Sequence, residues 1–316
     1  MKTIYHFSGA GNDFVVIDGR EGDVSAFREV SRIEELCREY KTDGLMILGS
    51  GDAGVDFTME FYNPDGSGGM MCGNGGRCIV AFADYLGIRP ACHPELAEGS
   101  YLFRAPDGLH PGEILDRPED GLWTVRIKMI DVQGITPMLG GYFLNTGTRH
   151  FVKFVDDVEQ VDVEAEGKTL RWDPAFAPIG TNVNFVHVAP DGLHVRTFEK
   201  GVEGETLACG TGLTASAIAA YEISRLRPAG SARNDNDPVI STKAGDDGSV
   251  ISTKAGDDGS VISTKAEGRV EKSYRLRARQ DWRSVDFTPG ADDTFTDVYL
   301  TGPARLVGIK EGSAQG

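Results

Sequence analysis

Apolar and polar residues alternate along several short segments of the chain, and this alternation predicts β-strands. Residues 4–7 and 14–18 show the pattern on either side of a glycine-rich turn at 8–12, so we expect a hairpin there. Further strands are predicted in both halves of the chain, at residues 44–48, 57–62, 142–144, 151–155, 184–188 and 193–198.

Three other segments have the apolar spacing of helices. In residues 32–40 apolar positions recur every three or four residues, with Ser31 as the expected N-cap and Cys37 as an expected core residue. The apolar, alanine-containing segments 76–86 and 213–225 predict two buried helices.

The two halves of the chain share one order of features. Each contains strands, then a cysteine among glycines (Cys72 or Cys209), and then one of the buried helices. With 316 residues the chain is long enough for two cores of roughly 150 residues each. We therefore expect an α/β (α+β) fold of two similar domains, 1–136 and 137–316, with a last strand that could return to the first domain.

Two stretches have the character of insertions. In residues 239–266 the unit VISTKAGDDGS occurs twice, and a third copy begins before the sequence diverges, so we expect an extended hairpin or a mobile loop. Residues 90–100 contain Cys92 and His93 and are typical of a surface loop. We interpret this Cys-His pair as solvent-exposed loop residues rather than as a site.

Charge narrows the range of partners. The chain has 32 Lys and Arg against 48 Asp and Glu, a net charge of -16, which opposes binding to nucleic acid or to anionic membranes. A small-molecule partner fits this charge better. Neither a signal-peptide pattern in the first 14 residues nor an apolar run of membrane-spanning length is present, so we expect a cytoplasmic protein.

The cysteines are expected to be thiols. They number five, an odd count with irregular spacing, which does not suit a disulfide framework. Their spacing and the scattered histidines do not suggest a zinc site either, and we assign no metal.

Cys72 and Cys209 carry the chemistry that we expect. Each lies among glycines directly before a predicted helix, where unsatisfied N–H groups and the helix dipole bind a carboxylate and favour thiolate over thiol. If the two helix starts converge on one carboxylate, its α-carbon lies between the two sulfurs. One thiolate and one thiol could then invert that carbon without a cofactor, because the donors on the carboxylate stabilise the enediolate.

Other interpretations of these segments are weaker. A single cysteine among glycines is more often a packed small residue, and it is the second copy that favours chemistry. The glycine-rich turns lack both GxxxxGK[ST] and GxGxxG in its usual context, which argues against a nucleotide site. If the sulfurs face each other, oxidation that joins them is expected as an inactivating reaction rather than as a function.

The chain resembles the diaminopimelate epimerase family in five blocks that occur in the family's order, at residues 9–14, 63–78, 145–150, 182–185 and 199–212. The resemblance implies two pseudo-symmetric domains, each a mixed sheet wrapped around a central helix, that close over the substrate. It also implies an isomerase that converts LL-2,6-diaminopimelate to the meso form, without a cofactor, in lysine and peptidoglycan biosynthesis.

The resemblance further implies roles for individual residues, with Cys72 and Cys209 as the acid–base pair. Backbone N–H groups of Gly73, Asn74, Gly210 and Thr211 would hold the reacting carboxylate, and Asn12 would contact the amine beside it. The distal amino-acid end of the substrate and the surroundings of the thiols would be served by Asn63, Thr148, His150, Asn182, Glu199 and Lys200.

Three positions depart from the family pattern. Lys200 stands where many relatives have arginine, Thr148 where asparagine is usual, and Gly44 where some members have glutamine. These differences leave open a racemase or epimerase of another amino acid, of the proline, hydroxyproline or histidine type, or a catalytically silent binding relative. The sequence also leaves open which cysteine acts on which stereoisomer and whether the protein forms a homodimer.

Overall fold

The computed structural model describes residues 2–52, 54–69, 71–207, 209–226, 265–266, 269–279 and 281–311. It divides into two compact units. Unit 1 contains Met1–Lys128 and Thr301–Gly316, and unit 2 contains Met129–Leu300. The first segment of unit 1 therefore ends at Lys128. The sequence had led us to expect the first domain to end at residue 136. Strand β19 (Thr294–Glu311) runs from unit 2 into unit 1.

In unit 1 the described strands form a closed ring. Following the pairings, the order is β7-β6-β5-β4-β3-β2-β1-β19 and back to β7. The strands of the ring are β1 (Thr3–Ser8), β2 (Asp13–Asp18), β3 (Gly44–Ser50), β4 (Phe57–Tyr62), β5 (Tyr101–Ala105), β6 (Gly108–Glu119), β7 (Leu122–Lys128) and β19. The pairs β2–β3 and β4–β5 are parallel and the others antiparallel, so the sheet is mixed.

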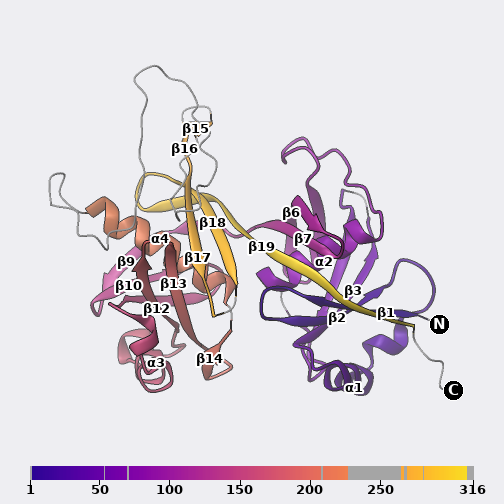
Figure 1. Ribbon diagram of the computed structural model, residues 1–316, viewed down its shortest axis with the longest axis horizontal. Coiled ribbons are helices and arrows are strands. Elements are labelled where there is room, and N and C mark those ends of the chain that lie inside the picture. The colour runs from indigo at the N-terminus through magenta and orange to yellow at the C-terminus, as the bar shows by residue number, and fades with distance from the viewer. Residues whose placement is uncertain are drawn as a thin grey trace. The chain divides into compact units, whose positions relative to one another are not determined.

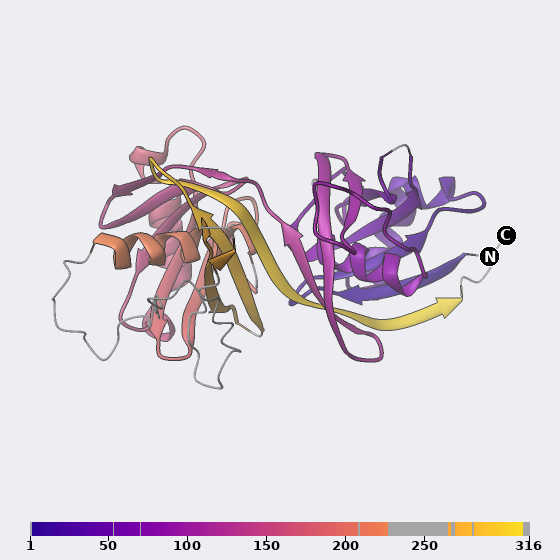
Figure 2. The same cartoon turned by 90° about the horizontal axis from the view of Figure 1, so that it is seen from above.

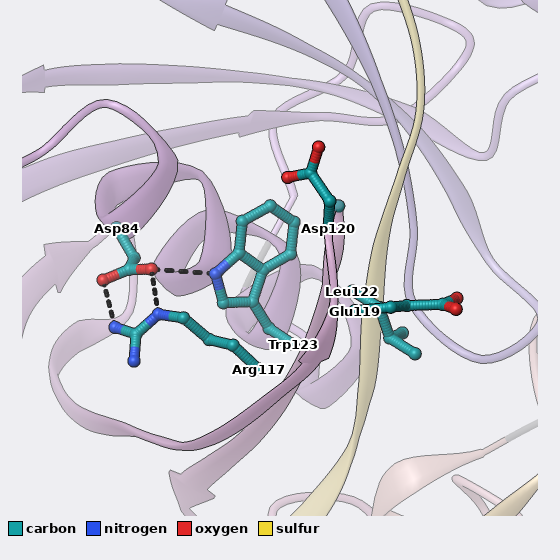
Figure 3. Close-up of a pocket in the computed structure, with 7 residues that line it drawn as sticks. Asp84, Arg117, Glu119, Asp120, Leu122 and Trp123 are labelled. Carbon is teal, nitrogen blue, oxygen red and sulfur yellow. Dashed lines mark hydrogen bonds and ion pairs between the residues drawn. The ribbon is translucent and has the colours of Figure 1, made fainter.

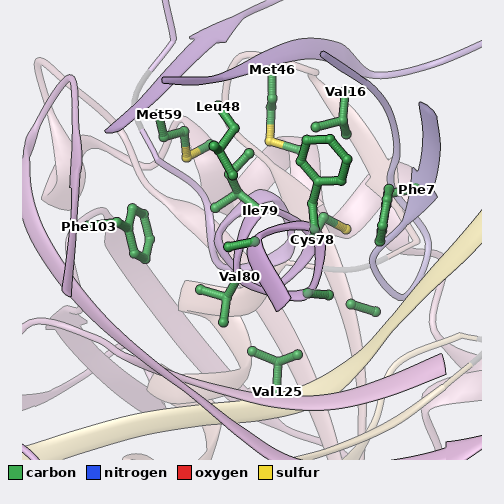
Figure 4. Close-up of a cluster of buried hydrophobic side chains, with 14 of the residues drawn as sticks. Phe7, Val16, Met46, Leu48, Met59, Cys78, Ile79, Val80, Phe103 and Val125 are labelled. Atoms are coloured by element: carbon green, nitrogen blue, oxygen red, sulfur yellow. The ribbon is translucent and has the colours of Figure 1, made fainter. Parts of the chain in front are cut away.

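Helix α2 (Gly73–Tyr85) fills this ring. Every residue from Gly73 to Ala83 is buried, which a helix with one polar face would not allow. Cys78, Ile79 and Val80 are fully buried among side chains of the strands, including Met46 and Phe103 (Figure 4). Among its described residues, unit 1 has two further helical segments, η1 (Ser25–Arg28) and α1 (Val30–Tyr40), and α1 packs on β2 and β3.

Unit 2 has a second mixed sheet around a second buried helix. Its pairings run β9-β10-β11-β12-β13-β17-β18, with β14 also on β13 and β8 on β19. Helix α4 (Gly210–Leu226) packs against β10, β11, β12, β13, β17 and β18 (Figures 1 and 2). The strands are β8 (Val132–Gln133), β9 (Ile135–Met138), β10 (Gly141–Asn145), β11 (Arg149–Phe154), β12 (Asn182–Ala189), β13 (Gly192–Glu199), β14 (Gly204–Thr206), β17 (Lys272–Arg277) and β18 (Trp282–Pro289).

The described part of unit 2 also contains three short helices and a pair of two-residue strands. The helices η2 (Val158–Gln160), α3 (Val163–Arg171) and η3 (Pro174–Phe176) lie between β11 and β12. Strands β15 (Lys265–Ala266) and β16 (Arg269–Val270) pair with each other. The end of the tandem repeat thus coincides with β15, whereas the hairpin or loop expected for 239–264 lies outside the described residues. None of the described helices is long and apolar enough to cross a membrane.

The predicted strands are confirmed, and so is the hairpin of β1 and β2. Cys37 is a core residue, 3% exposed. The N-cap of α1 is Glu29, without a side-chain cap hydrogen bond, so the prediction of Ser31 is wrong. Both buried helices begin three residues earlier than predicted. Their first turns are rich in glycine, which has weak helix propensity, but burial inside the sheet stabilises them.

The loop expected at residues 90–100 is confirmed, since it contains no helix or strand. Cys92 is exposed, as expected. His93 is not: its side chain is only 9% exposed and its Nε2 lies 2.9 Å from Oδ2 of Asp56. Asp56 also accepts hydrogen bonds from the backbone N–H groups of Ala91 and Leu102. The histidine therefore fastens the loop to the sheet.

A carboxylate held by two arginines joins the strands on one side of unit 2. Each oxygen of Glu205 on β14 accepts one bond from Arg196 (both 2.7 Å) and one from Arg279 (2.8 and 2.6 Å). Arg196 also donates to the carbonyls of Val158 and Val161. Burial alone raises the pKa of Glu205, but the bonds and charges of the two arginines outweigh it and lower the pKa to about 2.

This cluster predicts an acid-sensitive contribution to stability. Because the folded pKa of Glu205 lies below the ordinary 4.5, its stabilising effect is fully present above pH 4.5 and is lost as pH falls towards 2. Glu205→Gln should lower the free energy of unfolding by about 2–4 kcal/mol at pH 7. Urea denaturation at pH 7, 4.5 and 3 should show the gap between variant and wild type closing with acid.

Glu166→Gln is the matched control, because Glu166 pairs with Lys153 at the surface, with 45% and 36% of their side chains exposed. It should change stability by less than about 1 kcal/mol. A Glu205→Gln deficit that stays the same at all three pH values would contradict the assigned cause.

Candidate functional site

Cys72 lies at the start of α2, as its N-cap. Its backbone is extended (φ -105°, ψ 152°), and the carbonyl accepts a hydrogen bond from the N–H of Gly76 at 2.8 Å. The Sγ atom accepts from the N–H of Gly75 at 3.2 Å. The side chain is exposed and the sulfur is a thiol rather than half of a disulfide. The sulfur thus lies against the donor end of a helix, where negative charge is favoured.

A buried arginine orders the polar side chains behind Cys72. Nδ2 of Asn74 donates to Oδ1 of Asn12 at 2.6 Å, and Nη2 of Arg77 donates to Oδ1 of Asn74 at 2.6 Å. Arg77 is fully buried and also donates to the carbonyls of Gly9 and Pro303. The arginine fixes the Asn74 amide, which in turn directs its NH₂ group to Asn12.

Two glycines of unit 1 are required by close contacts. A Cβ at Gly9 would lie 2.7 Å from the carbonyl oxygen of Asn74 and 2.8 Å from Sγ of Cys78. A Cβ at Gly44 would lie 2.7 Å from the carbonyl oxygen of Tyr62. At position 44, where some relatives have glutamine, the backbone thus lies so close to that of Tyr62 that a side chain would fit only if the backbone moved.

Asn63 belongs to the turn that precedes Cys72. Its backbone N–H donates to the carbonyl of Ser67 at 2.8 Å, and its Nδ2 donates to the hydroxyl of Ser67 at 3.0 Å. The hydroxyl of Ser67 is oriented by Asp65. In this arrangement the amide of Asn63 stabilises the turn itself.

In unit 2, Cys209 stands at the start of α4. Its carbonyl accepts from the N–H of Leu213 at 2.9 Å, and its Sγ lies 3.4 Å from Oγ1 of Thr211. A Cβ at Gly212 would lie 3.3 Å from this sulfur and 2.3 Å from Oδ1 of Asn184, so the helix start needs glycine there. Cys209 is also a thiol, but only 8% exposed.

The expectation of a lowered pKa is wrong for Cys209. Burial, followed by the charge of Glu199, raises the pKa of its thiol to about 12. Contacts with Thr211 and Gly212 and the charge of Arg283 act in the opposite direction without outweighing the burial. Burial also raises the pKa of Glu199, against a hydrogen bond with Thr206. Desolvation exceeds the effect of the helix terminus at this sulfur.

His150 lies behind Thr211 and is fully buried. Its Nε2 is 2.9 Å from the hydroxyl oxygens of both Thr148 and Thr211, and its Nδ1 is 3.0 Å from Nδ2 of Asn184. Burial lowers the pKa of His150 to about 3. The imidazole is therefore neutral near pH 7.

Asn182 connects this network to Lys200. Its Nδ2 donates to the carbonyl of Arg149 at 2.9 Å and to the hydroxyl of Thr148 at 3.3 Å. Its Oδ1 accepts from the backbone N–H of Lys200 at 2.8 Å. The amide therefore holds the end of β13, where Glu199 is partly buried and Lys200 is exposed.

The structure thus brings the predicted residues together in two groups. Unit 1 gathers Cys72, Gly73, Asn74 and Asn12, with Asn63 in the turn before them. In unit 2 one connected network includes Thr148, His150, Asn182, Lys200, Cys209 and Thr211, with Gly210 at the helix start and Glu199 acting on Cys209.

Sequence reasoning missed three polar residues of these groups, namely Arg77, Asn184 and Arg283. A signal existed for Asn184, because it is a polar residue in an apolar strand, two positions after Asn182. Arg77 stands at the start of an otherwise apolar helix, which could also have marked it as a buried charge. Nothing in the sequence near Arg283 distinguishes it from other strand residues.

A shallow pocket of unit 1 lies at the other end of α2. It is lined by Asp84, Arg117 and residues 119–123 (Figure 3). Asp84 accepts two hydrogen bonds from Arg117 and one, at 2.8 Å, from the indole N–H of Trp123. Cys72 and Asp84 are 12 positions apart, or about 18 Å along the helix, so this pocket is separate from the thiol. Its polar groups hold β6 and β7 to the helix.

Among the described residues, no group of three or more His, Cys, Asp or Glu side chains is placed to hold a metal ion.

Comparison with known proteins identifies relatives. The family model named diaminopimelate epimerase matches residues 4–102 and 142–266. The diaminopimelate epimerase of Chlorobaculum tepidum is 39% identical over 228 residues, which cover 69% of this chain and 83% of that protein. That of Flavobacterium psychrophilum is 40% identical over 220 residues, covering 68% and 80%.

Solved structures show the same fold at low identity. A phenazine biosynthesis protein of the PhzF family from Bacillus anthracis has a TM-score of 0.63 at 12% identity, covering 99% of both chains. A hydroxyproline epimerase from Agrobacterium vitis, with bound trans-4-hydroxy-L-proline, has a TM-score of 0.54 at 14% identity, covering 98% of this chain and 91% of that one. The predicted α+β fold class is confirmed.

The two thiols are expected to differ in reactivity. Cys72 is exposed beside a helix N-terminus, whereas Cys209 is buried with a raised pKa, so iodoacetamide at pH 7 should modify Cys72 at least about tenfold faster. Peptide mass spectrometry separates both from the exposed Cys92, and the buried Cys37 and Cys78 serve as slow references. Equal rates at Cys72 and Cys209 would contradict the burial argument.

Proposed function

The chain belongs to the diaminopimelate epimerase family, and from this premise we propose that it converts LL-2,6-diaminopimelate to meso-diaminopimelate with Cys72 and Cys209 as its acid–base pair. The observation that carries the proposal is that both units have a glycine-flanked thiol at the start of their buried helix. The proposal requires these two helix starts to face one substrate carbon.

The reaction needs one base and one acid on opposite faces of the α-carbon. In the proposed resting state Cys72 is the thiolate and Cys209 the thiol, as their exposure and the raised pKa of Cys209 favour. The Cys72 thiolate takes the α-proton, and the Cys209 thiol gives its own proton to the other face. After this step Cys72 is the thiol and Cys209 the thiolate. The reverse reaction returns both sulfurs to the resting state.

The charge that develops on the substrate is proposed to be held by backbone N–H groups. Those of Gly73, Asn74, Gly210 and Thr211 stand in the first turns of α2 and α4, where no carbonyl of the same helix can accept from them. A carboxylate bound there would lie at the positive ends of two helix dipoles. Such fixed donors stabilise an enediolate without reorganisation of water.

The remaining residues are proposed to select the substrate. Asn12 would contact the reacting amine, since its Oδ1 already accepts from an NH₂ group. Glu199 suits the distal ammonium and Lys200 the distal carboxylate, with Asn63, Thr148 and Asn182 around them. Because the amide of Asn182 already bonds to Lys200 and Arg149, its proposed role is to place Lys200 as well as to contact substrate. His150 would support the thiol side.

The compartment and the pathways that we expected from the sequence are part of the same proposal. We propose that the enzyme works in the cytoplasm, on a small amino acid and in lysine and peptidoglycan biosynthesis. The homodimer that the sequence left open is a question for light scattering of the purified protein.

The first test is proton NMR of the reduced protein with LL-diaminopimelate in D₂O. The α-proton signal should disappear as the meso isomer forms. Cys72→Ala and Cys209→Ala should each slow this exchange by at least about 10³-fold, because each variant lacks one of the two acid–base groups. Cys92→Ala, which removes an exposed thiol from a loop, should leave the rate unchanged.

Proline, 4-hydroxyproline and histidine are the comparison substrates. Exchange with one of them and not with diaminopimelate would keep the two-thiol mechanism and refute the substrate. If no amino acid exchanged, the protein would be a silent relative and the proposed activity would be wrong.

Lys200 supplies a test of the distal contact. Lys200→Ala should raise KM for diaminopimelate about tenfold with little change in kcat, because a charge that binds ground state and transition state alike is removed. Lys200→Arg should restore the low KM, since a guanidinium binds a carboxylate with two parallel bonds. Lys168→Ala, a change at an exposed position on α3, is the control. An unchanged KM in Lys200→Ala would refute the contact.

A further inference from the structure

We propose that Asn184 and His150 form a hydrogen-bond relay that makes the Thr211 hydroxyl a donor to Sγ of Cys209. The inference rests on the function proposed above, because it assigns positioning residues to one of the two thiols of that reaction. It is carried by the donor-to-acceptor directions of three successive hydrogen bonds, from Asn184 to His150, from His150 to Thr211 and from Thr211 to Cys209.

The first direction is set by Asn184 on β12, which is fully buried. Its Oδ1 accepts from the hydroxyl of Thr197 at 3.0 Å, and its Nδ2 lies 3.3 Å from the carbonyl oxygen of Phe151. A carbonyl can only accept, so the nitrogen of the amide must face Phe151. The same nitrogen therefore donates its second hydrogen to Nδ1 of His150, 3.0 Å away.

The second direction follows from the charge of His150. The ring is fully buried without a carboxylate among its hydrogen-bond partners, and burial keeps it neutral. A neutral imidazole has one N–H group, and because Nδ1 accepts from Asn184, the hydrogen is on Nε2. Nε2 lies 2.9 Å from Oγ1 of Thr148 and 2.9 Å from Oγ1 of Thr211, so it donates into this pair of hydroxyls.

The last direction follows from the two threonines. Thr148 also accepts from Nδ2 of Asn182 at 3.3 Å, and its oxygen lies 3.2 Å from that of Thr211. Whether the hydrogen of Nε2 goes to Thr211 directly or through Thr148, the Thr211 oxygen is an acceptor on the side of the histidine. Its own hydrogen is then left for Sγ of Cys209 at 3.4 Å, which is the strongest acceptor nearby whenever the sulfur is a thiolate.

The relay opposes the groups that disfavour a thiolate at Cys209. Burial and the charge of Glu199, on β13, favour the thiol. The N–H of Gly212 on α4 and the charge of Arg283 on β18 favour the thiolate, as does Thr211. In the proposed reaction Cys209 becomes a thiolate in every cycle. A fixed donor at this sulfur therefore stabilises a form of the enzyme through which each turnover must pass.

The corresponding position in unit 1 is used differently. Asn74 follows Cys72 at the same spacing as Thr211 follows Cys209, but its amide is engaged by Asn12 and Arg77. Sγ of Cys72 accepts from the backbone N–H of Gly75. The relay is assigned to Cys209, where a side-chain hydroxyl lies against the sulfur.

The tautomer of His150 can be measured in the unaltered protein. Nitrogen-15 NMR of histidine-labelled protein, with the signal assigned by loss in His150→Gln, should show a neutral ring with the hydrogen on Nε2 at pH 7. A ring with the hydrogen on Nδ1, or a protonated ring, would overturn the proposal without any question about the folding of a variant.

The effect on the sulfur is measured by the rate at which iodoacetamide modifies Cys209 at pH 9, followed by peptide mass spectrometry. Because the thiolate is the reacting form, Thr211→Val should lower this rate about tenfold. Thr211→Ser should restore the rate to within about twofold, because it keeps the hydroxyl.

Thr214→Val is the matched control, since the hydroxyl of Thr214 lies on the same helix and bonds to the carbonyl of Gly210. It should leave the modification rate of Cys209 unchanged. A rate that does not change in Thr211→Val, or that falls as far in Thr214→Val, would refute the relay. Neither measurement uses a substrate, so these results stand apart from failure of the proposed activity, which the exchange of diaminopimelate alone decides.

Discussion

The enclosure of a central helix by the sheet of each unit is the constraint on which the other features depend. Residues Gly73 to Ala83 of α2 are all buried, and at the beginning of a helix the first N–H groups have no partner within it. Buried donors need acceptors, and small residues are needed if acceptors are to come close. The cysteine sulfurs at the helix starts and the glycines around them follow from this single requirement, and it is the basis on which a carboxylate is proposed to bind there.

The two units meet this requirement with different electrostatics. Behind Cys72 the polar groups are ordered by Arg77, a permanent positive charge that orients Asn74. Behind Cys209 they are ordered by His150, which is neutral and acts only through the direction of its hydrogen bonds. Glu199 adds negative charge on this side. The sequences around the two cysteines are alike, but the two sulfurs have unlike surroundings, which suits a reaction that begins with one base and one acid.

The sequence was informative where a feature depends on local pattern. Alternation located the hairpin of β1 and β2, and the glycine-flanked cysteines located both helix starts to within three residues. Strands β5 to β9 and β17 to β19 were not predicted, although β5–β6, β6–β7 and β17–β18 pair between neighbours in the chain and β7 alternates buried and partly buried residues. In β6 the alternation is interrupted by two prolines and several charged residues. The N-cap of α1 was misplaced because Ser31 has the right chemistry but lies inside the helix.

The site followed the same division between local and distant causes. Cys72 and Asn74 could be chosen from sequence because glycine and cysteine before a helix have a defined chemistry. The pKa of Cys209 could not be predicted from sequence, because it depends on desolvation and on the charge of Glu199, which lies on strand β13. Asn184 acts on Cys209 through His150 and Thr211. These three residues come from three elements, β12, β11 and α4. No spacing in the sequence encodes the direction of such bonds.

The unequal surroundings also bear on how the cycle closes. A thiol with a pKa near 12 gives up its proton reluctantly, so delivery from Cys209 would be the harder half of the proposed reaction unless donors reach the sulfur as it becomes negative. The N–H of Gly212 and the hydroxyl of Thr211 are already placed to do so, which lowers the cost of reorganisation at that step. Burial then has two effects at Cys209: it keeps the thiol protonated before the step, and it strengthens each hydrogen bond to the thiolate after it.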